Sequence, residues 1–313
     1  MFSFIMSIIT FGFFVRRSWN LYIKLTDEFI SVGLGVNRDA KQMATHKKHL
    51  IVRTSRLIKL KIIRFQRGND YFILGNSLYY LGKYEDAVEC YDRSLKIDPK
   101  NKYAWCNRGI TLGVMGKYDR ALVCWDELLS IDGQFVEAWF NKGVALSRLY
   151  KLDDALKCYD KVLGIDGEIK DGWYNRGVIL SELGRYEDAI RSYDKSLLSG
   201  DDEEVWFNKG AALSELERHD EALECYHKAI LINEKLKEAW NGVGLSLAEL
   251  GNFEEANEYY DRALALDDRY RDAWYNKGVA FDILGRYEDA QRCYNRGIAI
   301  EKLLRDEGLR ASI

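Results

Sequence analysis

The sequence predicts an all-α solenoid, because one pattern of 34 residues recurs from residue 68 to residue 304 of the 313-residue chain. The stretch Trp173–Leu197 returns as Trp274–Ile298, with 14 of its 25 residues identical. Tryptophan marks the same phase six times, at Trp105, Trp139, Trp173, Trp206, Trp240 and Trp274. These markers are 34 residues apart, except for one interval of 33 that indicates a deletion near 199–202. A period of this length is typical of a solenoid, in which each unit packs only against its neighbours.

Each repeat is predicted to form two antiparallel helices joined by a short turn. In the unit 170–202, intervals of three and four place one set of residues on the first helical face: Trp173, Gly177, Leu180 and Leu183. The same spacing defines a second face, formed by Tyr186, Ala189, Tyr193 and Ser196. Gly184 separates the two and marks the turn. Gly177 and Ala189 lack bulk, so we expect the two helices to cross closely there.

The pattern resembles the tetratricopeptide repeat, a family with glycine at position 8 and alanine at position 20. All seven units carry the glycine, at Gly75, Gly109, Gly143, Gly177, Gly210, Gly244 and Gly278. The alanines are Ala87, Ala121, Ala155, Ala189, Ala222, Ala256 and Ala290. The resemblance implies a right-handed superhelix of seven antiparallel helix pairs. Its units are 68–101, 102–135, 136–169, 170–202, 203–236, 237–270 and 271–304, between an N-terminal extension of 1–67 and a tail of 305–313.

One column departs from the family pattern. Position 7, where the family usually has leucine, is basic in five units: Arg108, Lys142, Arg176, Lys209 and Lys277. Because the change recurs in register, we interpret it as a subfamily trait. We expect these cations to pair with acidic turn residues such as Glu187 and Asp188.

The resemblance also places positions 2, 5 and 6 on the concave surface, where this family binds its partners. Position 2 is acidic in Glu137, Asp171 and Glu204; position 5 is aromatic in Phe140, Tyr174, Phe207 and Tyr275; position 6 is asparagine in Asn107, Asn141, Asn175, Asn208 and Asn276. These twelve residues are the candidate site. A carboxamide both donates and accepts hydrogen bonds, so the asparagines suit the backbone of an extended peptide. The row is similar to the asparagine ladder of O-linked N-acetylglucosamine transferases. Alternatively, the asparagines bond neighbouring backbone and hold the repeats in register.

The charge distribution predicts the chemistry of a partner. Residues 68–313 carry 33 Lys and Arg against 46 Asp and Glu, whereas residues 1–67 carry 13 against 3. We therefore expect the array to bind basic, partly apolar protein or peptide segments, with no nucleic-acid partner. Position 5 holds no lysine, which argues against the carboxylate clamp with which some family members hold chaperone tails. Self-association is expected if one end of the array is incompletely covered.

No constellation of residues points to an enzyme, a cofactor or a metal site. The 67 residues before the array and the 9 after it are too few for an appended catalytic domain of the kind found with such repeats elsewhere. Five of the six cysteines occupy one repeat position, so we expect reduced apolar fillers rather than disulfides. The histidines lack the partners that a zinc site needs. The leading prediction is a non-catalytic protein-interaction scaffold.

The N-terminal extension supports an alternative function. Met1–Val15 is apolar and uncharged, and Arg16 and Arg17 follow it. Fifteen residues are fewer than the roughly 17–25 of a spanning helix, and no cleavage signal is evident. The alternative is a regulatory or assembly subunit held at a membrane by residues 1–25, with the array in the cytoplasm. For the basic segment His46–Arg67 we favour a capping role over contact with anionic lipid or with the acidic groove.

Overall fold

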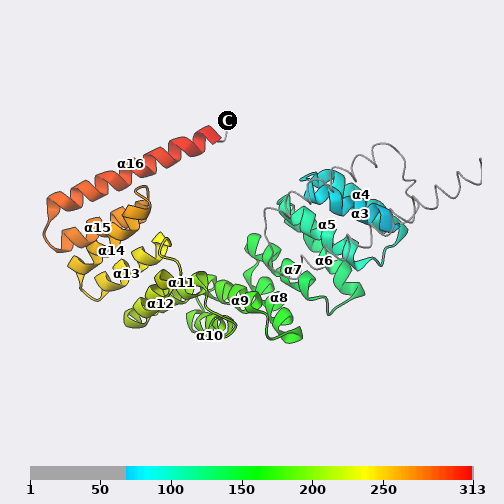
Figure 1. The fold of residues 1–313 in the computed structure, drawn as a ribbon, viewed down its shortest axis with the longest axis horizontal. Coiled ribbons are helices and arrows are strands. Elements are labelled where there is room, and N and C mark those ends of the chain that lie inside the picture. The colour runs from blue at the N-terminus through cyan, green and yellow to red at the C-terminus, as the bar shows by residue number, and fades with distance from the viewer. Residues whose placement is uncertain (1–67, 312–313) are drawn as a thin grey trace, which may run out of the picture. The chain divides into compact units, whose positions relative to one another are not determined.

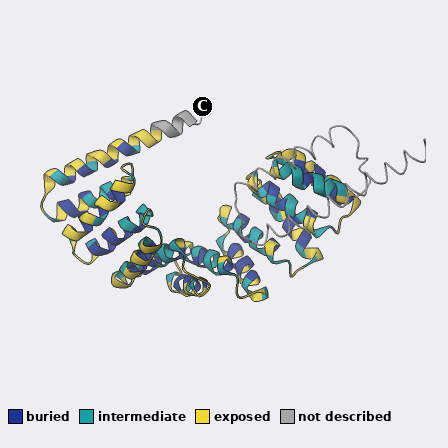
Figure 2. Ribbon diagram, in the orientation of Figure 1, coloured by how far each residue is buried: buried dark blue, intermediate teal, exposed yellow. Residues whose placement is uncertain are grey.

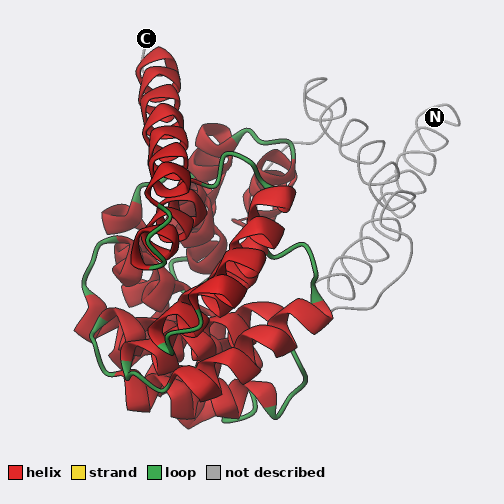
Figure 3. Ribbon diagram, turned by 90° about the vertical axis from the view of Figure 1, so that its left-hand side faces the viewer, coloured by secondary structure: helices red, strands yellow, loops and turns green. Residues whose placement is uncertain are grey.

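The computed structural model describes residues 68–311, with side chains to residue 305, so the N-terminal extension lies outside the described residues. The described chain forms helices joined by short turns, and it contains no strand (Figure 3). The helices are α3 (Gly68–Tyr80), α4 (Tyr84–Ile97), α5 (Lys102–Val114), α6 (Tyr118–Ile131), α7 (Val136–Arg148), α8 (Leu152–Ile165), α9 (Lys170–Glu182), α10 (Tyr186–Leu197), α11 (Glu203–Glu215), α12 (His219–Ile232), α13 (Lys237–Glu249), α14 (Phe253–Leu266), α15 (Arg271–Ile283) and α16 (Tyr287–Ala311).

These helices form consecutive antiparallel pairs, as Figure 1 shows along the chain from α3 to α16. From α4 onward, each helix packs against the helices next to it in the chain, and the first helices of several adjacent pairs also touch, as α5 and α7 do. The predicted α-solenoid of seven helix pairs is therefore confirmed. Helix α10 has 12 residues, whereas α8 and α12 have 14, so the one-residue deletion coincides with a shortened second helix.

The turn within each pair requires a left-handed backbone conformation at position 15. Glycine occupies this position in five units, with φ between 71° and 85°. Tyr150 and Glu217 hold the same position in the other two units, at φ of 55° and 59°. A side chain disfavours this conformation, so these two turns are maintained by the packing of the helices on either side.

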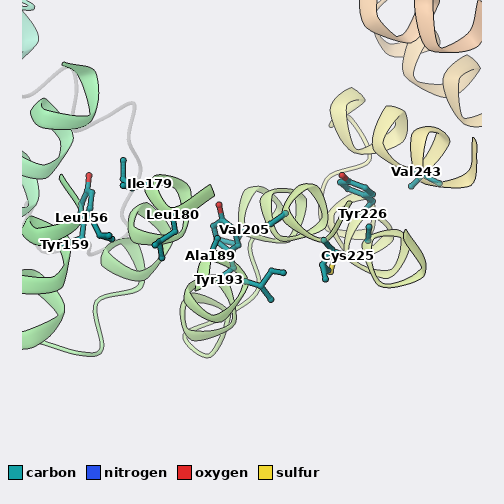
Figure 4. Close-up of a cluster of buried hydrophobic side chains, with 14 of the residues drawn as sticks. Leu156, Tyr159, Ile179, Leu180, Ala189, Tyr193, Val205, Cys225, Tyr226 and Val243 are labelled. Carbon is teal, nitrogen blue, oxygen red and sulfur yellow. The ribbon is translucent and has the colours of Figure 1, made fainter. Parts of the chain in front are cut away.

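The core lies between the helices and consists of a repeating contact between glycine and an aromatic ring. A Cβ built on Gly177 would lie 2.5 Å from Cε1 of Tyr193, whose side chain is buried. Gly143 faces Tyr159, and Gly210 faces Tyr226, in the same way. Figure 4 shows these tyrosines within one buried cluster, and Figure 2 shows buried residues on the facing sides of the helices. The expectation that the small residues allow a close helix crossing is met, because the ring fills the space that a methyl group would need.

Candidate functional site

The acidic, aromatic and asparagine columns lie on the first helix of each pair. Positions 2, 5 and 6 of the unit 170–202 are Asp171, Tyr174 and Asn175 on α9. The intervals of three and one place them within one turn and one side of the helix. Asp171 is exposed, whereas Tyr174 and Asn175 are half-buried. Residues of the same type have the same burial on α7 and α11, so the columns repeat from one pair to the next.

Each aromatic residue at position 5 packs against an aromatic ring on the second helix of its own pair. The ring centroids are 5.7 Å apart for Phe140 and Tyr159, and 5.8 Å apart for Phe207 and Tyr226. Tyr275 lies 6.3 Å from Tyr294. These separations are those of favourable aromatic pairs. The aromatic column is thereby held in place while these residues stay partly exposed.

The asparagines at position 6 use their amide hydrogens within the protein. Asn141 and Asn175 donate from Nδ2 to the backbone oxygens of Glu137 and Asp171, each at 2.8 Å. The other three reach the preceding repeat: Asn107 Nδ2 to Asn76 Oδ1 at 2.8 Å, Asn208 Nδ2 to the Tyr174 hydroxyl at 3.0 Å, and Asn276 Nδ2 to Asn241 Oδ1 at 3.1 Å.

The side-chain oxygens of three position-6 asparagines take no part in these hydrogen bonds. Within the described residues, no hydrogen bond reaches Oδ1 of Asn141, Asn175 or Asn208. A ligand on this surface would therefore have to donate hydrogen bonds, as a peptide N–H does. The amide donors therefore serve the fold, as the second of the two alternatives expected, and ligand binding by the acceptors of Asn141, Asn175 and Asn208 stays a prediction.

The carboxylates at position 2 carry the charge of this surface. Glu137 and Asp171 are exposed and form no salt bridge within the part of the chain that the structure describes. Glu204 accepts a hydrogen bond of 3.4 Å from the hydroxyl of Tyr174. Burial, together with the charge of Glu204, raises the pKa of Tyr174 to about 12. The tyrosine is therefore a neutral hydrogen-bond donor at physiological pH.

The basic residues at position 7 pair differently from the sequence expectation. Arg176 Nε bonds Asp160 Oδ1 at 2.8 Å, on the second helix of the preceding pair, and Arg176 Nη1 donates to Ser192 Oγ at 2.7 Å. The predicted pairing with Glu187 and Asp188 is wrong, because Asp188 pairs with arginines on its own side of the turn. The hydrogen bond from Arg185 lowers the pKa of Asp188.

This contact recurs at five junctions between repeats, and we call it the inter-repeat lock. Its members are Arg108–Asp92 at 2.6 Å, Lys142–Asp126 at 2.5 Å, Arg176–Asp160 at 2.8 Å, Lys209–Asp194 at 2.5 Å and Lys277–Asp261. Four of the cations also lie over the tryptophan of their own repeat, 5.3 to 5.8 Å from the ring centroid. The aspartates recur with the same period in the sequence. That recurrence was a signal for the lock that the sequence analysis missed.

The junction between units 203–236 and 237–270 lacks the lock. Val243 replaces the cation and is fully buried, and His227 replaces the aspartate. Tyr259 stands at position 23, where the other units have cysteine or serine. Its ring centroid is 5.9 Å from those of both His227 and Trp240. All three members of the contact have changed together, so aromatic packing takes the place of the ion pair.

The six cysteines lie in the interior of the array. All six thiols are free and buried. Burial raises the pKa of Cys158 to about 11 and that of Cys106 to about 12, so both remain protonated at neutral pH. The described residues contain no cluster of His, Cys, Asp or Glu that could hold a metal ion.

The repeat geometry agrees with sequence profiles of known families. The profile described as TPR repeat matches residues 75–113, and two profiles described as tetratricopeptide repeat match residues 171–198 and 203–236, and residues 106–168 and 242–299. The chain belongs to the tetratricopeptide repeat family. Repeats of this family are generally non-catalytic modules for protein interaction. No curated protein matches the sequence significantly.

Solved structures share the fold at low sequence identity. The C-terminal part of a repeat protein from Cytophaga hutchinsonii has a TM-score of 0.62 at 15% identity, covering 74% of this chain and 95% of that one. A tetratricopeptide repeat protein from Parabacteroides merdae has a TM-score of 0.60 at 16% identity, covering 76% and 97%. The Cut9–Hcn1 hetero-tetramer of the APC/C scores 0.55 at 16% identity, covering 81% and 50%. These likenesses establish the fold alone.

Proposed function

We propose that the array is a non-catalytic scaffold that binds extended, basic and partly apolar protein segments along positions 2, 5 and 6 of its first helices. The observation that carries this proposal is the row of exposed carboxylates, among which Glu137 and Asp171 form no salt bridge within the described residues. An exposed carboxylate in each of several adjacent repeats favours a cationic partner.

The neighbouring columns support the same class of ligand. Phe140, Tyr174 and Phe207 are partly exposed, and they offer apolar contact and cation–π contact to lysine or arginine side chains. The unoccupied Oδ1 atoms of Asn141 and Asn175 accept from the N–H groups of an extended backbone. A basic segment therefore finds charge, apolar surface and backbone acceptors within one turn of α7, of α9 and of α11.

The test is fluorescence anisotropy with the full chain and labelled peptides of equal length, either basic and partly apolar or acidic. The proposal requires tighter binding of the basic peptides and a loss of affinity as NaCl rises, because salt screens exposed charges. Equal affinity for both classes would rule it out. Replacing Asn141, Asn175 and Asn208 by Ala should weaken binding of the basic peptides.

A matched pair of charge variants separates this surface from the overall charge of the array. Glu137→Gln, Asp171→Asn and Glu204→Gln together remove three charges from the proposed surface. Glu187→Gln, Glu224→Gln and Glu258→Gln remove the same number from exposed positions on second helices. We expect a clear loss of affinity from the first triple variant only. Equal losses from both would show that the net charge of the array, rather than this surface, attracts the peptides.

A second candidate is a regulatory or assembly subunit held at a membrane by residues 1–25. It rests on the apolar run Met1–Val15 and on the arginines that follow it, all outside the described residues. No helix among residues 68–311 is both long and apolar enough to cross a membrane. Flotation of the full chain with liposomes, beside a 68–313 truncation, distinguishes the candidates. Flotation of the full chain alone would favour the anchored subunit.

Self-association is part of the proposal and has its own support. Ile298 on α16 is 55% exposed, whereas Leu264, at the same position of the preceding unit, is 7% exposed. The last pair therefore lacks the covering that a following pair provides elsewhere. Sedimentation at increasing concentration should show oligomers, and a strict monomer throughout would contradict self-association.

A further inference from the structure

A cavity of about 460 Å³ lies between three helices, and it shares no residue with the twelve-residue candidate site. It is lined by Asp160, Leu163 and Gly164 of α8, Trp173 and Arg176 of α9, and Arg191, Ser192 and Lys195 of α10. Its volume falls in the range of sites that hold small molecules. The lining combines an aromatic ring with three cations and one carboxylate.

Gly164 distinguishes this junction from the others. A Cβ built on Gly164 would meet no atom within 4 Å, so the glycine leaves open space at the edge of the cavity. The other units have side chains at the same repeat position: Lys96, Ser130, Leu198, Leu231, Ala265 and Ala299. Of the seven units, only 136–169 has glycine there.

The cations around the cavity differ in how far the protein already neutralises them. Arg176 donates hydrogen bonds to Asp160 and Ser192. Arg191 pairs with Asp188 and is 70% exposed. Lys195 is exposed and forms no salt bridge within the described residues. Asp160 and Asp188 therefore neutralise two of the three cations, and Lys195 supplies the unpaired positive charge that favours an anion.

Trp173 supplies a fixed aromatic wall. Its indole Nε1 donates to the backbone oxygen of Gly167 at 2.8 Å, which holds the orientation of the ring. In the following unit, Lys228 Nζ lies 4.1 Å from the ring centroid of Trp206 and covers it. Lys195 occupies the position of Lys228 but has no such contact with Trp173 within the described residues. Arg176 Cζ lies 5.8 Å from the ring centroid of Trp173, so this ring is less closely covered than that of Trp206, and Lys195 remains available to a ligand.

We propose that this cavity binds an oxyanion carried on an aromatic ring, as in an aryl phosphate or an aryl carboxylate. The aromatic ring packs against Trp173 and Leu163, in the space that Gly164 leaves open. The oxyanion lies between Lys195 and Arg191. The site is independent of the proposed peptide surface, because no residue belongs to both.

The proposal is tested by isothermal titration calorimetry of the full chain with phenyl phosphate, benzoate, inorganic phosphate and benzylamine. Saturable binding of phenyl phosphate or benzoate is expected, and whichever binds more tightly identifies the oxyanion. Inorganic phosphate should bind on the order of tenfold more weakly, since it lacks the ring. Benzylamine, which carries the opposite charge, should not bind. Failure of both aryl anions to bind would overturn the proposal.

Two variants locate the binding, and each has a matched control. Gly164→Leu fills the cavity, and Lys195→Glu reverses its free charge; each should weaken binding of the aryl anion by about tenfold or more. Ala265→Leu and Lys228→Glu make the same changes at the corresponding positions of units that do not line the cavity and should leave affinity unchanged. Retained binding in Gly164→Leu, with its helical circular dichroism intact, would refute the location.

Discussion

At the scale of single residues, the atoms around a helical glycine show whether packing requires it. Gly177 and Gly164 both lie within helices, where glycine costs about 0.5–1 kcal/mol relative to alanine. Gly177 is needed because the ring of Tyr193 occupies the space beside it. Gly164 faces open space, so packing does not require it, and its cost to the fold is a reason to seek a role in binding.

Because the surroundings of Gly177 and Gly164 differ, substitution by alanine should have opposite effects on stability at the two positions. Gly177→Ala would place a Cβ 2.5 Å from the buried ring of Tyr193, and overpacking of this kind costs about 1–3 kcal/mol. We expect net destabilisation, even after the gain in helix propensity. Gly164→Ala should instead stabilise the array by about 0.5–1 kcal/mol. Urea denaturation followed by circular dichroism measures both, and a stable Gly177→Ala variant would contradict the packing account.

Buried thiols and phenols predict loss of stability at alkaline pH. Burial raises the pKa of Cys158 from 9.0 to about 11 and that of Tyr193 from 10.0 to about 12. Between the ordinary and the raised pKa of each group, the unfolded chain releases protons that the folded chain retains, so stability falls as pH rises. The contribution is fully present below pH 9. Thermal melts from pH 8 to pH 11 should show a falling midpoint, and an unchanged or rising midpoint would count against it.

At the scale of helices, the inter-repeat lock sets how one pair meets the next. The aspartates are about half exposed, so each ion pair contributes little by itself, typically about 0–1 kcal/mol. The bond joins the second helix of one pair to the first helix of the next, and it recurs at five junctions. Its main effect is therefore on the register between pairs rather than on the stability of any one pair.

At the junction between units 203–236 and 237–270, which lacks the lock, we expect the effects of three substitutions to be coupled. Val243→Lys alone would place an ammonium in a buried site beside His227, without an acidic partner, at a cost on the order of 3 kcal/mol. Adding His227→Asp and Tyr259→Cys rebuilds the lock of the other junctions and should recover most of that loss. Urea denaturation of the single and triple variants measures the recovery. A triple variant no more stable than Val243→Lys would refute the coupling.

At the scale of the whole described array, stability is distributed along a line of nearest-neighbour contacts. The largest buried cluster runs from Leu146 to Ala280, and smaller clusters lie on either side of it. Each helix pair in the middle packs on two neighbours, whereas α16 has a neighbour on one side only. In such an array the ends open before the centre.

Amide hydrogen exchange should be slower in the centre of the described array than at its ends. We expect the slowest amide exchange in α9 to α12, which lie within the largest cluster. The fastest exchange within a helix should occur in the part of α16 beyond Ile300, where Leu303 and Leu304 are 47% and 46% exposed. Mass spectrometry of peptic fragments resolves the helices. Uniform exchange along the array would show that it opens as a single cooperative unit.

Much of the fold followed from the sequence because the period is a local property. The 34-residue spacing, the glycine column and the alternating helical faces predicted seven helix pairs, and the structure confirms them. The same columns nominated the acidic, aromatic and asparagine residues of the candidate site. The structure places these residues on the first helices, and their binding role stays a prediction.

Which side chains share a helical face can be read from the amino-acid order, since this depends only on the helical repeat. Which faces meet across a junction depends on how one pair is displaced and rotated relative to the next, and only the packed structure shows it. Arg176 therefore bonds Asp160 rather than Glu187, and Asn208 reaches Tyr174. For the same reason the space beside Gly164 becomes a cavity only when three helices from two units are packed together.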